Sequence, residues 1–283
     1  MSDRSRTASI KGTLGALSPL TIFGIVLLCA IVVLAMIAPL ITKWGPTEID
    51  FNYFLSPPGT PDHLLGTDRN GMDIFSRILY AARIDVGVAL ASVAIAASVG
   101  SAIGAVVGFV GGWIDDIAMR VVDVFQSFPA FIFALGVAVV VGTSIPSLIT
   151  LLAVVNAPSY VRIMRAEVRA VKEHGWVEAA RCSGLSSTSI LFRQVVPNSM
   201  RPILVIAPLN CGWVILLLAA LSFVGLGIPI PEAEWGAMIS AGTEEIATGQ
   251  WWTSVVPGVM LFLTVLAFSL ASEGAQSRRS RSR

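Results

Sequence analysis

The stretch VFQSFPAFIFALGVAVVVGTSIPSLITLLAVVNAPSYV, residues 124–161, contains no charged residue over 38 positions. As one helix it would be about 57 Å long, whereas the hydrocarbon layer of a membrane is roughly 30 Å thick. Its middle, residues 142–146, reads GTSIP, which is a turn signal. The stretch therefore predicts two short membrane-spanning helices joined by a tight hairpin.

Four further charge-free runs flank this stretch, at residues 12–42, 86–114, 202–231 and 246–272. Each is long enough for one spanning helix, which needs about 20 apolar residues. We therefore expect an all-α polytopic membrane protein with six spans. They are expected near residues 20–42, 86–111, 124–142, 146–161, 203–224 and 254–272.

Composition supports residence in a membrane. Of the 283 residues, 55% are hydrophobic and 13% charged, which is about half the charged share of an average soluble domain. A soluble fold of this size would leave apolar side chains facing water, so a soluble enzyme is excluded. The net charge of +1 provides no bulk attraction to DNA or RNA, so no nucleic-acid partner is expected.

Basic residues predict the orientation. An even number of spans puts both termini on one side, and lysine and arginine concentrate on the cytoplasmic side. With the termini inside, 15 of the 19 basic residues are cytoplasmic. The predicted order is a cytoplasmic segment 1–19, the first span, an extracytoplasmic region 43–85, a five-helix core 86–272 and a basic cytoplasmic tail 273–283.

Several chemistries have no signature in this chain. The six predicted spans contain no Asp, Glu, Lys, Arg or His, and secondary transporters usually keep such groups at membrane depth. No phosphate-binding G-x-x-x-x-G-K-[ST] sequence, nucleophile motif or metal-ligand spacing occurs. His63 and His174 are expected to be solvated loop residues, and the three cysteines to be packing residues. We therefore expect no enzyme, no cofactor and no metal site, and uphill transport would need energy from another polypeptide.

The long inner loop 162–201 is the most informative hydrophilic segment. Its first part continues the fourth span, and EAARCSG (178–184) is followed by LSS and by ILFRQVVPN (190–198). This pattern predicts a helix, a glycine stop, a serine cap, a second helix and a break at Pro197. Small residues there would let another protein approach the backbone, although an ordinary capped surface helix fits equally well.

Motifs in four parts of the chain resemble one family. The 178–198 pattern resembles the EAA loop of permease subunits of ABC-type importers. LLGTDRNGMDIFSRILYAARIDV (64–86), LSFVGLGIPIPEAEWGAMI (221–239) and WWTSVVPGVMLFLTVLAFSLASEG (251–274) are similar to the dipeptide/oligopeptide/nickel branch of that family. Within the paired permeases of this branch, the chain resembles the shorter subunit.

The resemblance implies a type I importer permease fold in the plasma membrane of a prokaryote. It implies a second homologous permease, two ATP-binding subunits that hold ATP and magnesium, and an extracytoplasmic solute-binding protein. Peptides are the expected cargo, with nickel chelates, glutathione or haem as alternatives. The residues expected to couple the permease to the ATP-binding subunit are Glu178, Ala179, Ala180, Gly184, Leu185 and Pro197.

Two expectations concern the outer side and the pathway. Residues 74–89 predict an amphipathic helix that enters the second span with Arg77 and Arg83 at its wet end. Polar side chains at membrane depth are candidates for lining the pathway, although each could instead be satisfied by helix packing. These candidates are Gln126, Ser127, Asn156, Asn210 and Ser222. A stand-alone secondary transporter or channel and a structural membrane scaffold remain the competing interpretations.

Overall fold

The computed structural model describes residues 18–281, and side chains as far as residue 273. Over this range the chain is helical apart from loops and isolated bridges between single residues. Its α-helices and one π-helix, η1, are α2 (Pro19–Ile41), α3 (Ile74–Val110), α4 (Gly112–Ser127), α5 (Ala130–Val141), α6 (Ile145–Lys172), α7 (Gly175–Cys182), α8 (Ser187–Ile190), η1 (Leu191–Val195), α9 (Val196–Ser199), α10 (Arg201–Phe223), α11 (Trp235–Ala241), α12 (Thr243–Ile246) and α13 (Trp252–Arg281).

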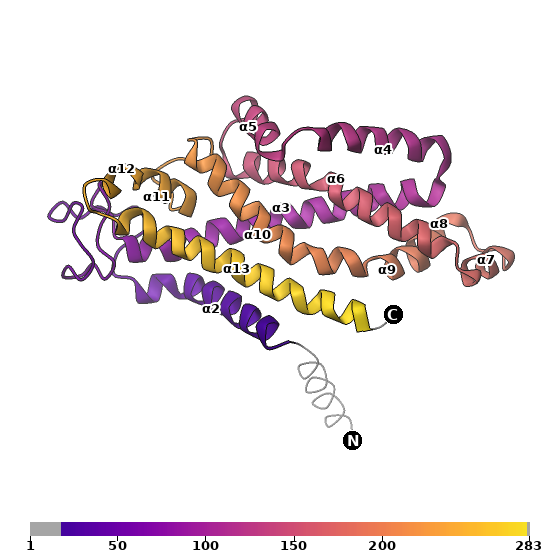
Figure 1. Ribbon diagram of the computed structural model, residues 1–283, viewed down its shortest axis with the longest axis horizontal. Helices are drawn as coiled ribbons and strands as arrows, with labels where there is room; N and C mark the ends of the chain where they lie inside the picture. The colour runs from indigo at the N-terminus through magenta and orange to yellow at the C-terminus, as the bar shows by residue number, and fades with distance from the viewer. Residues whose placement is uncertain (1–17, 282–283) are drawn as a thin grey trace, which may run out of the picture.

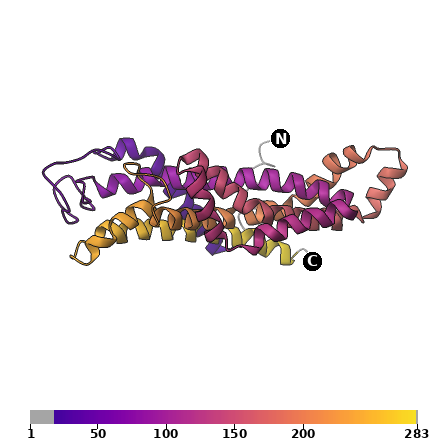
Figure 2. The ribbon, with the colours of Figure 1, turned by 90° about the horizontal axis from the view of Figure 1, so that it is seen from above.

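The long helices run along the longest axis of the molecule (Figures 1 and 2). Among the described residues, five helices are long and apolar enough to cross a membrane, and the pair α4–α5 makes a sixth candidate if it is one bent span. The all-α multi-span prediction is therefore confirmed. The short helix α7 lies at one end of the bundle, and α11 and α12 lie near the other (Figure 1).

The closest seam in the bundle joins α3 to α6. Gly100, Gly104 and Gly108 lie one helical turn apart on α3, and each faces the α6 backbone. A Cβ atom at Gly104 would lie 2.4 Å from the Val161 carbonyl oxygen, which is too close for any side chain. Small residues at this spacing let two membrane helices pack backbone to backbone, so α3 and α6 form a tight pair.

The third predicted span differs from the structure. We expected one helix over 124–142, but α4 starts at Gly112 and breaks after Ser127, and α5 leaves it at an angle of 88°. Phe128 is extended at the break, since the residue before a proline disfavours helical backbone. The spans were predicted from charge-free runs, so the charged residues of α4 excluded the first part of this helix from the prediction. The hairpin between α5 and α6 is where the GTSIP sequence predicted it.

The second span is part of a longer helix than expected. Asp73 caps α3 by accepting the Ser76 N–H at 2.7 Å, and the helix then runs without interruption for 37 residues. Arg77 is 4% exposed instead of lying at a wet end. Its guanidinium donates to the Pro46 carbonyl at 2.7 Å and to the Pro231 carbonyl at 3.2 Å. The expectation was wrong because loops on both sides cover this arginine.

His63 also differs from expectation. It is 1% exposed, its Nδ1 lies 3.0 Å from Asp73 Oδ1, and its ring stacks on Trp44. It is therefore a buried member of the segment between α2 and α3, not a solvated residue. No group of three or more metal-ligating side chains occurs among the residues that the structure describes.

The start of α2 and the end of α13 both point towards the α7 end of the bundle (Figure 1). Close packing joins these two parts, since a Cβ at Gly24 would lie 2.5 Å from Leu270 Cβ. Residues 1–17 of the predicted cytoplasmic segment 1–19 lie outside the described residues. The side chains of the basic tail lie outside them beyond residue 273.

Candidate functional site

The 162–201 segment forms a projecting arm at one end of the bundle. Helix α6 continues to Lys172, and the chain turns at Glu173 and His174 into α7. Only Val177 of α7 is buried, with 0% exposure. One apolar side chain thus anchors α7 to its own chain, while most of the helix faces outward.

Backbone hydrogen bonds end α7 at Gly184. The Gly184 N–H donates to the Arg181 carbonyl at 3.0 Å, and the Leu185 N–H donates to the Ala180 carbonyl at 3.3 Å. This pair of bonds is a Schellman motif, which needs a left-handed residue, and Gly184 has φ of +81°. A side chain at Gly184 would meet no atom within 4 Å. The predicted glycine stop is confirmed, and the space beside it is open.

A serine cap starts the next helix. The Ser186 hydroxyl accepts the Ser189 N–H at 3.3 Å, which agrees with the predicted cap. The predicted break at Pro197 is wrong, because α9 runs through Pro197 to Ser199. A proline in the first turn of a helix needs no N–H partner, and the π-helical turn Leu191–Val195 immediately precedes it. The helix ends at Ser199 instead, and Met200 separates it from α10.

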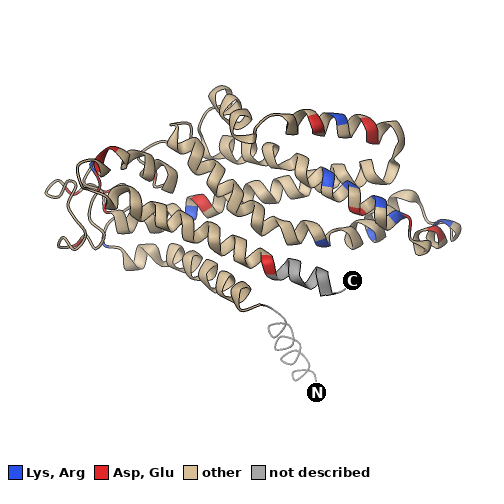
Figure 3. Cartoon of the chain, viewed as in Figure 1, with Lys and Arg blue, Asp and Glu red and all other residues tan. Residues whose placement is uncertain are grey.

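The predicted coupling residues lie together on this arm. Ala180 is half-buried against the core, whereas the other five are exposed. Large apolar side chains are exposed there too, with Trp176 at 41% and Leu185 at 44%. Figure 3 shows that lysine and arginine gather towards the same end of the bundle. The exposed coupling residues are Glu178, Ala179, Gly184, Leu185 and Pro197.

Three of the five candidate pathway residues line one cavity. Gln126, Asn156 and Asn210 come from α4, α6 and α10 and border a space of about 510 Å³, with Trp213 and Phe133 among the other lining residues. Gln126 Nε2 donates to the Ser159 hydroxyl at 3.4 Å. The Nδ2 atoms of Asn156 and Asn210 are buried without a hydrogen-bond partner. Unpaired amide N–H groups beside a cavity can donate hydrogen bonds to the carbonyl oxygens of a ligand.

The other two candidates lie elsewhere. Ser127 is at the α4–α5 break, where its hydroxyl donates to the Val124 carbonyl at 2.7 Å. Ser222 lies near the end of α10 and borders a second cavity of about 450 Å³, beside Thr143, Ile228 and Glu244. The structure thus divides the five between a mid-bundle cavity, the α4–α5 break and the α11 end.

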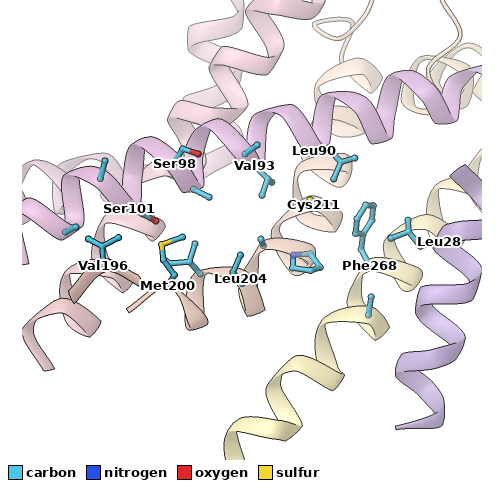
Figure 4. Close-up of a pocket in the computed structure, with 18 of the residues that line it drawn as sticks. Leu28, Leu90, Val93, Ser98, Ser101, Val196, Met200, Leu204, Cys211 and Phe268 are labelled. Atoms are coloured by element: carbon cyan, nitrogen blue, oxygen red, sulfur yellow. The ribbon is translucent and has the colours of Figure 1, made fainter. Parts of the chain in front are cut away.

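A third cavity, of about 620 Å³, is apolar (Figure 4). Helices α2, α3, α10 and α13 and the η1–α9 segment surround it, and its lining contains no charged residue. Ser98 and Ser101 carry its only hydroxyl groups, opposite Met200, Leu204 and Phe268. Such a lining offers a peptide backbone almost no hydrogen-bond partner, so the mid-bundle cavity is the better candidate for a polar cargo.

One buried pair of carboxyl groups was missed by the sequence analysis. Asp85 of α3 and Glu234, the cap of α11, are each 1% exposed and lie side by side. Asp85 precedes the predicted span by one residue, so a search within spans could not find it. The Asp85 carboxylate accepts the N–H of Trp235, which is 150 residues away in the sequence. No local pattern could have indicated such a pairing.

Comparison with known proteins agrees with this geometry. Residues 100–281 match the family described as "Binding-protein-dependent transport system inner membrane component". The chain belongs to this family. A dipeptide transport system permease of Alkalihalophilus pseudofirmus is 34% identical to this chain. The aligned region covers 90% of this chain and 83% of the relative. A probable D,D-dipeptide transport system permease of Escherichia coli K12 is 35% identical over 91% of this chain and 86% of the relative.

A glutathione transport system permease of Escherichia coli O1:K1 is 36% identical over 86% of this chain and 81% of the relative. These matches confirm the family resemblance that the sequence motifs indicated. The permease is thus a membrane component of an ABC-type transport system, and its part is transport and not catalysis.

Proposed function

We propose that this permease forms half of the translocation pathway of an ATP-driven peptide importer. A second homologous permease would form the other half, two ATP-binding subunits would hydrolyse ATP, and an extracytoplasmic solute-binding protein would deliver the peptide. The transported class is inferred from relatives named for dipeptide transport. Both termini and α7 would face the cytoplasm of a prokaryote, which the basic residues near α7 support (Figure 3).

The exposed arm carries this proposal. Helix α7 has its own stop, exposes Trp176 and buries only Val177, and Leu185 just beyond its end is also exposed. An apolar surface at the end of a bundle, beside lysines and arginines, is typical of a contact with another protein. We infer that α7 is seated in a groove of the ATP-binding subunit. Nucleotide binding would then move α7, and α6 would transmit this movement because it continues directly from the arm.

The mid-bundle cavity supports a polar cargo. Asn156 and Asn210 would offer their free amide N–H groups to peptide carbonyls, with Gln126 on the wall formed by α4. The lining contains no charged residue, so it would hold a charged peptide weakly. Weak binding suits a pathway that receives its cargo from a receptor and must release it. Glutathione, the cargo named for one relative, is a peptide with the same carbonyl chemistry.

Reconstitution in liposomes tests the function. We expect ATP-dependent uptake of a radiolabelled dipeptide when both permeases and the ATP-binding subunits are present with the solute-binding protein, and no flux from this permease alone. ATP-independent flux through the single purified chain would instead support a secondary transporter or a channel.

Substitution in the arm tests the coupling. We expect Glu178→Lys combined with Gly184→Trp to abolish co-purification of the ATP-binding subunit and uptake, while membrane insertion is retained. Glu244→Lys reverses an exposed carboxylate near the opposite end of the bundle and should leave co-purification unchanged. Normal uptake by the double variant would refute the coupling role, as a passive membrane scaffold predicts.

A further inference from the structure

The buried carboxyl groups of Asp85 and Glu234 meet where α3 contacts α11. Asp85 Oδ2 accepts the Trp235 N–H at 3.1 Å. Glu234 Oε1 accepts the Gly236 N–H, and Oε2 accepts the Ala237 N–H, both at 2.7 Å. Both carboxyl groups are therefore committed to the first turn of α11, and neither reaches solvent.

No cation among the described residues pairs with these two carboxyl groups. On α3, Arg77 donates to loop carbonyls and lies 3.7 Å from Asp68, and Arg83 donates to the carbonyls of Ala35 and Met36 on α2. Helix α2 has no charged residue, and α13 has none before Glu273. From α10 only the Ser222 hydroxyl faces Glu234.

The remaining neighbours do not supply a positive charge. Glu232 precedes α11 in the loop and interacts electrostatically with Arg77. Two carboxylates buried in contact without a cation would repel each other and would both lose their hydration. A single proton removes one charge and replaces the repulsion with a hydrogen bond. The cluster is thus stable with one proton and unstable with none.

The hydrogen bonds indicate where this proton lies. Both oxygens of Glu234 accept backbone N–H groups, which suits a carboxylate. Asp85 Oδ2 also accepts an N–H, but Asp85 Oδ1 is buried with no conventional hydrogen-bond partner. A hydroxyl at Oδ1 would donate to Glu234 and would explain this unpaired oxygen. The proton is taken up from water during folding, and no other bond is made or broken.

We propose that Asp85 and Glu234 share one proton, and that this proton positions α11 against α3 at the outer mouth of the pathway. This end of the bundle is the outer one in the orientation proposed above, on which the location of the mouth rests. Helix α11 presents Ala237, Ser240 and Ala241 to the 450 Å³ cavity, so it forms a wall of that mouth. Loss of the proton would leave two buried negative charges, which would push Glu234 and α11 away from α3. Asp85 and Glu234 are positioning residues in this view.

The expected pH dependence has a definite sign. Burial raises the pKa of Glu234 above its ordinary value. A proton held in the folded state and lost in the unfolded state stabilises the fold at acid pH. This stability declines as the pH rises from about 4, where unfolded carboxyl groups titrate, through the raised pKa. Thermal stability and uptake should therefore both fall at alkaline pH.

Asp85→Asn tests the shared proton in the full chain. The amide oxygen can still accept the Trp235 N–H, and the amide nitrogen can donate to Glu234 at every pH. We expect the infrared carbonyl band of a protonated carboxylic acid in the wild-type protein at pH 7, and loss of that band in Asp85→Asn. The thermal midpoint of the variant should no longer fall with rising pH. Glu244→Gln removes an exposed carboxyl near the same end and should leave the band and pH profile unchanged.

Two results would overturn the proposal. One is a wild-type protein without the protonated-acid band at neutral pH, which can be measured even if the variant does not fold. The other is an alkaline loss of stability that Asp85→Asn leaves unchanged. Neither readout requires the ATP-binding subunit or a peptide. Failure of this proposal is therefore distinguishable from failure of the proposed transport function.

Discussion

Helices α7 and α11 have almost the same length, 8 and 7 residues, but opposite surroundings. Helix α7 buries one residue and has no side-chain cap at its start. Helix α11 buries Trp235, Gly236 and Met238, and Glu234 caps it with two hydrogen bonds. The Trp235 indole also donates to the Ile78 carbonyl at 3.1 Å. A short helix needs partners for its free backbone groups and its apolar face. The chain supplies them for α11 and leaves most of α7 exposed, as the docking role proposed for α7 requires.

The largest expected effect follows substitution at Gly236. A Cβ atom there would lie 2.5 Å from Ala219 Cα and 2.7 Å from its carbonyl oxygen, both on α10. We expect Gly236→Leu to displace α11 and to destabilise the fold by about 3 kcal/mol or more. Fluorescence-detected size-exclusion chromatography after heating would measure this, and uptake should also be lost. A wild-type thermal midpoint would show that α11 is not clamped as described.

The matching change in α7 should affect assembly without affecting folding. Ala179 is exposed on the arm, so Ala179→Trp meets little of its own chain, and its effect on stability should stay within about 0.5 kcal/mol. The added indole would block close approach of another protein, so the ATP-binding subunit should no longer co-purify. A lower thermal midpoint in the isolated permease would contradict the view that α7 contributes little to the fold.

A smaller effect is expected where α4 braces the helix that carries α7. Asp115 of α4 accepts hydrogen bonds from Arg165 and, at 3.1 Å, from Arg169, and its side chain is 5% exposed. Asp115→Asn should cost about 1–3 kcal/mol, because Arg165 loses its charged partner. Asp123 pairs with Arg162 at the surface, so Asp123→Asn should cost at most about 1 kcal/mol. Chemical denaturation measures both changes in the free energy of unfolding. Equal losses in the two variants would contradict the view that the buried Asp115 pairs stabilise the α4–α6 contact more than the surface pair does.

The smallest effect is expected at Gly87 of α3, two residues after Asp85. It is exposed in the helix, and a Cβ there would meet nothing within 4 Å. Gly87→Ala should stabilise α3 by about 0.5–1 kcal/mol, since alanine loses less backbone freedom in a helix. The thermal midpoint should rise while uptake is unchanged, in contrast to the loss expected for Gly236→Leu. A lower midpoint would contradict the open surroundings of Gly87.

The fold was largely predictable from charge-free runs, because the membrane demands long apolar helices. The helix of the arm, its stop at Gly184 and the cap at Ser186 were also predictable, since these depend on residues close together in the chain. The bend after Ser127 was not predicted, because α4 carries charged residues that pair with α6 and that excluded its first turns from the charge-free run. Burial of Arg77 and His63 could not be predicted, because it depends on how irregular loops fold. Loops on both sides cover Arg77, and residues of the segment between α2 and α3 enclose His63.

The pathway candidates show the same limit. Polarity at membrane depth selected Gln126, Asn156 and Asn210, which come together only through the packing of α4, α6 and α10. The same criterion selected Ser222, which instead faces Glu234. Asp85 was overlooked because its importance arises from a neighbour on another helix. Pathway function itself remains a prediction for all five candidates.

The glycine seam has a mechanical consequence. Close contact at Gly100, Gly104 and Gly108 with the α6 backbone leaves α3 and α6 little room to shift against each other. Helix α6 leads directly into the arm, and α3 holds α11 through Asp85. If the arm moves with an ATP-binding subunit as proposed, we expect α3 and α6 to move together as one rigid unit and to displace α11 at the distant end of the bundle.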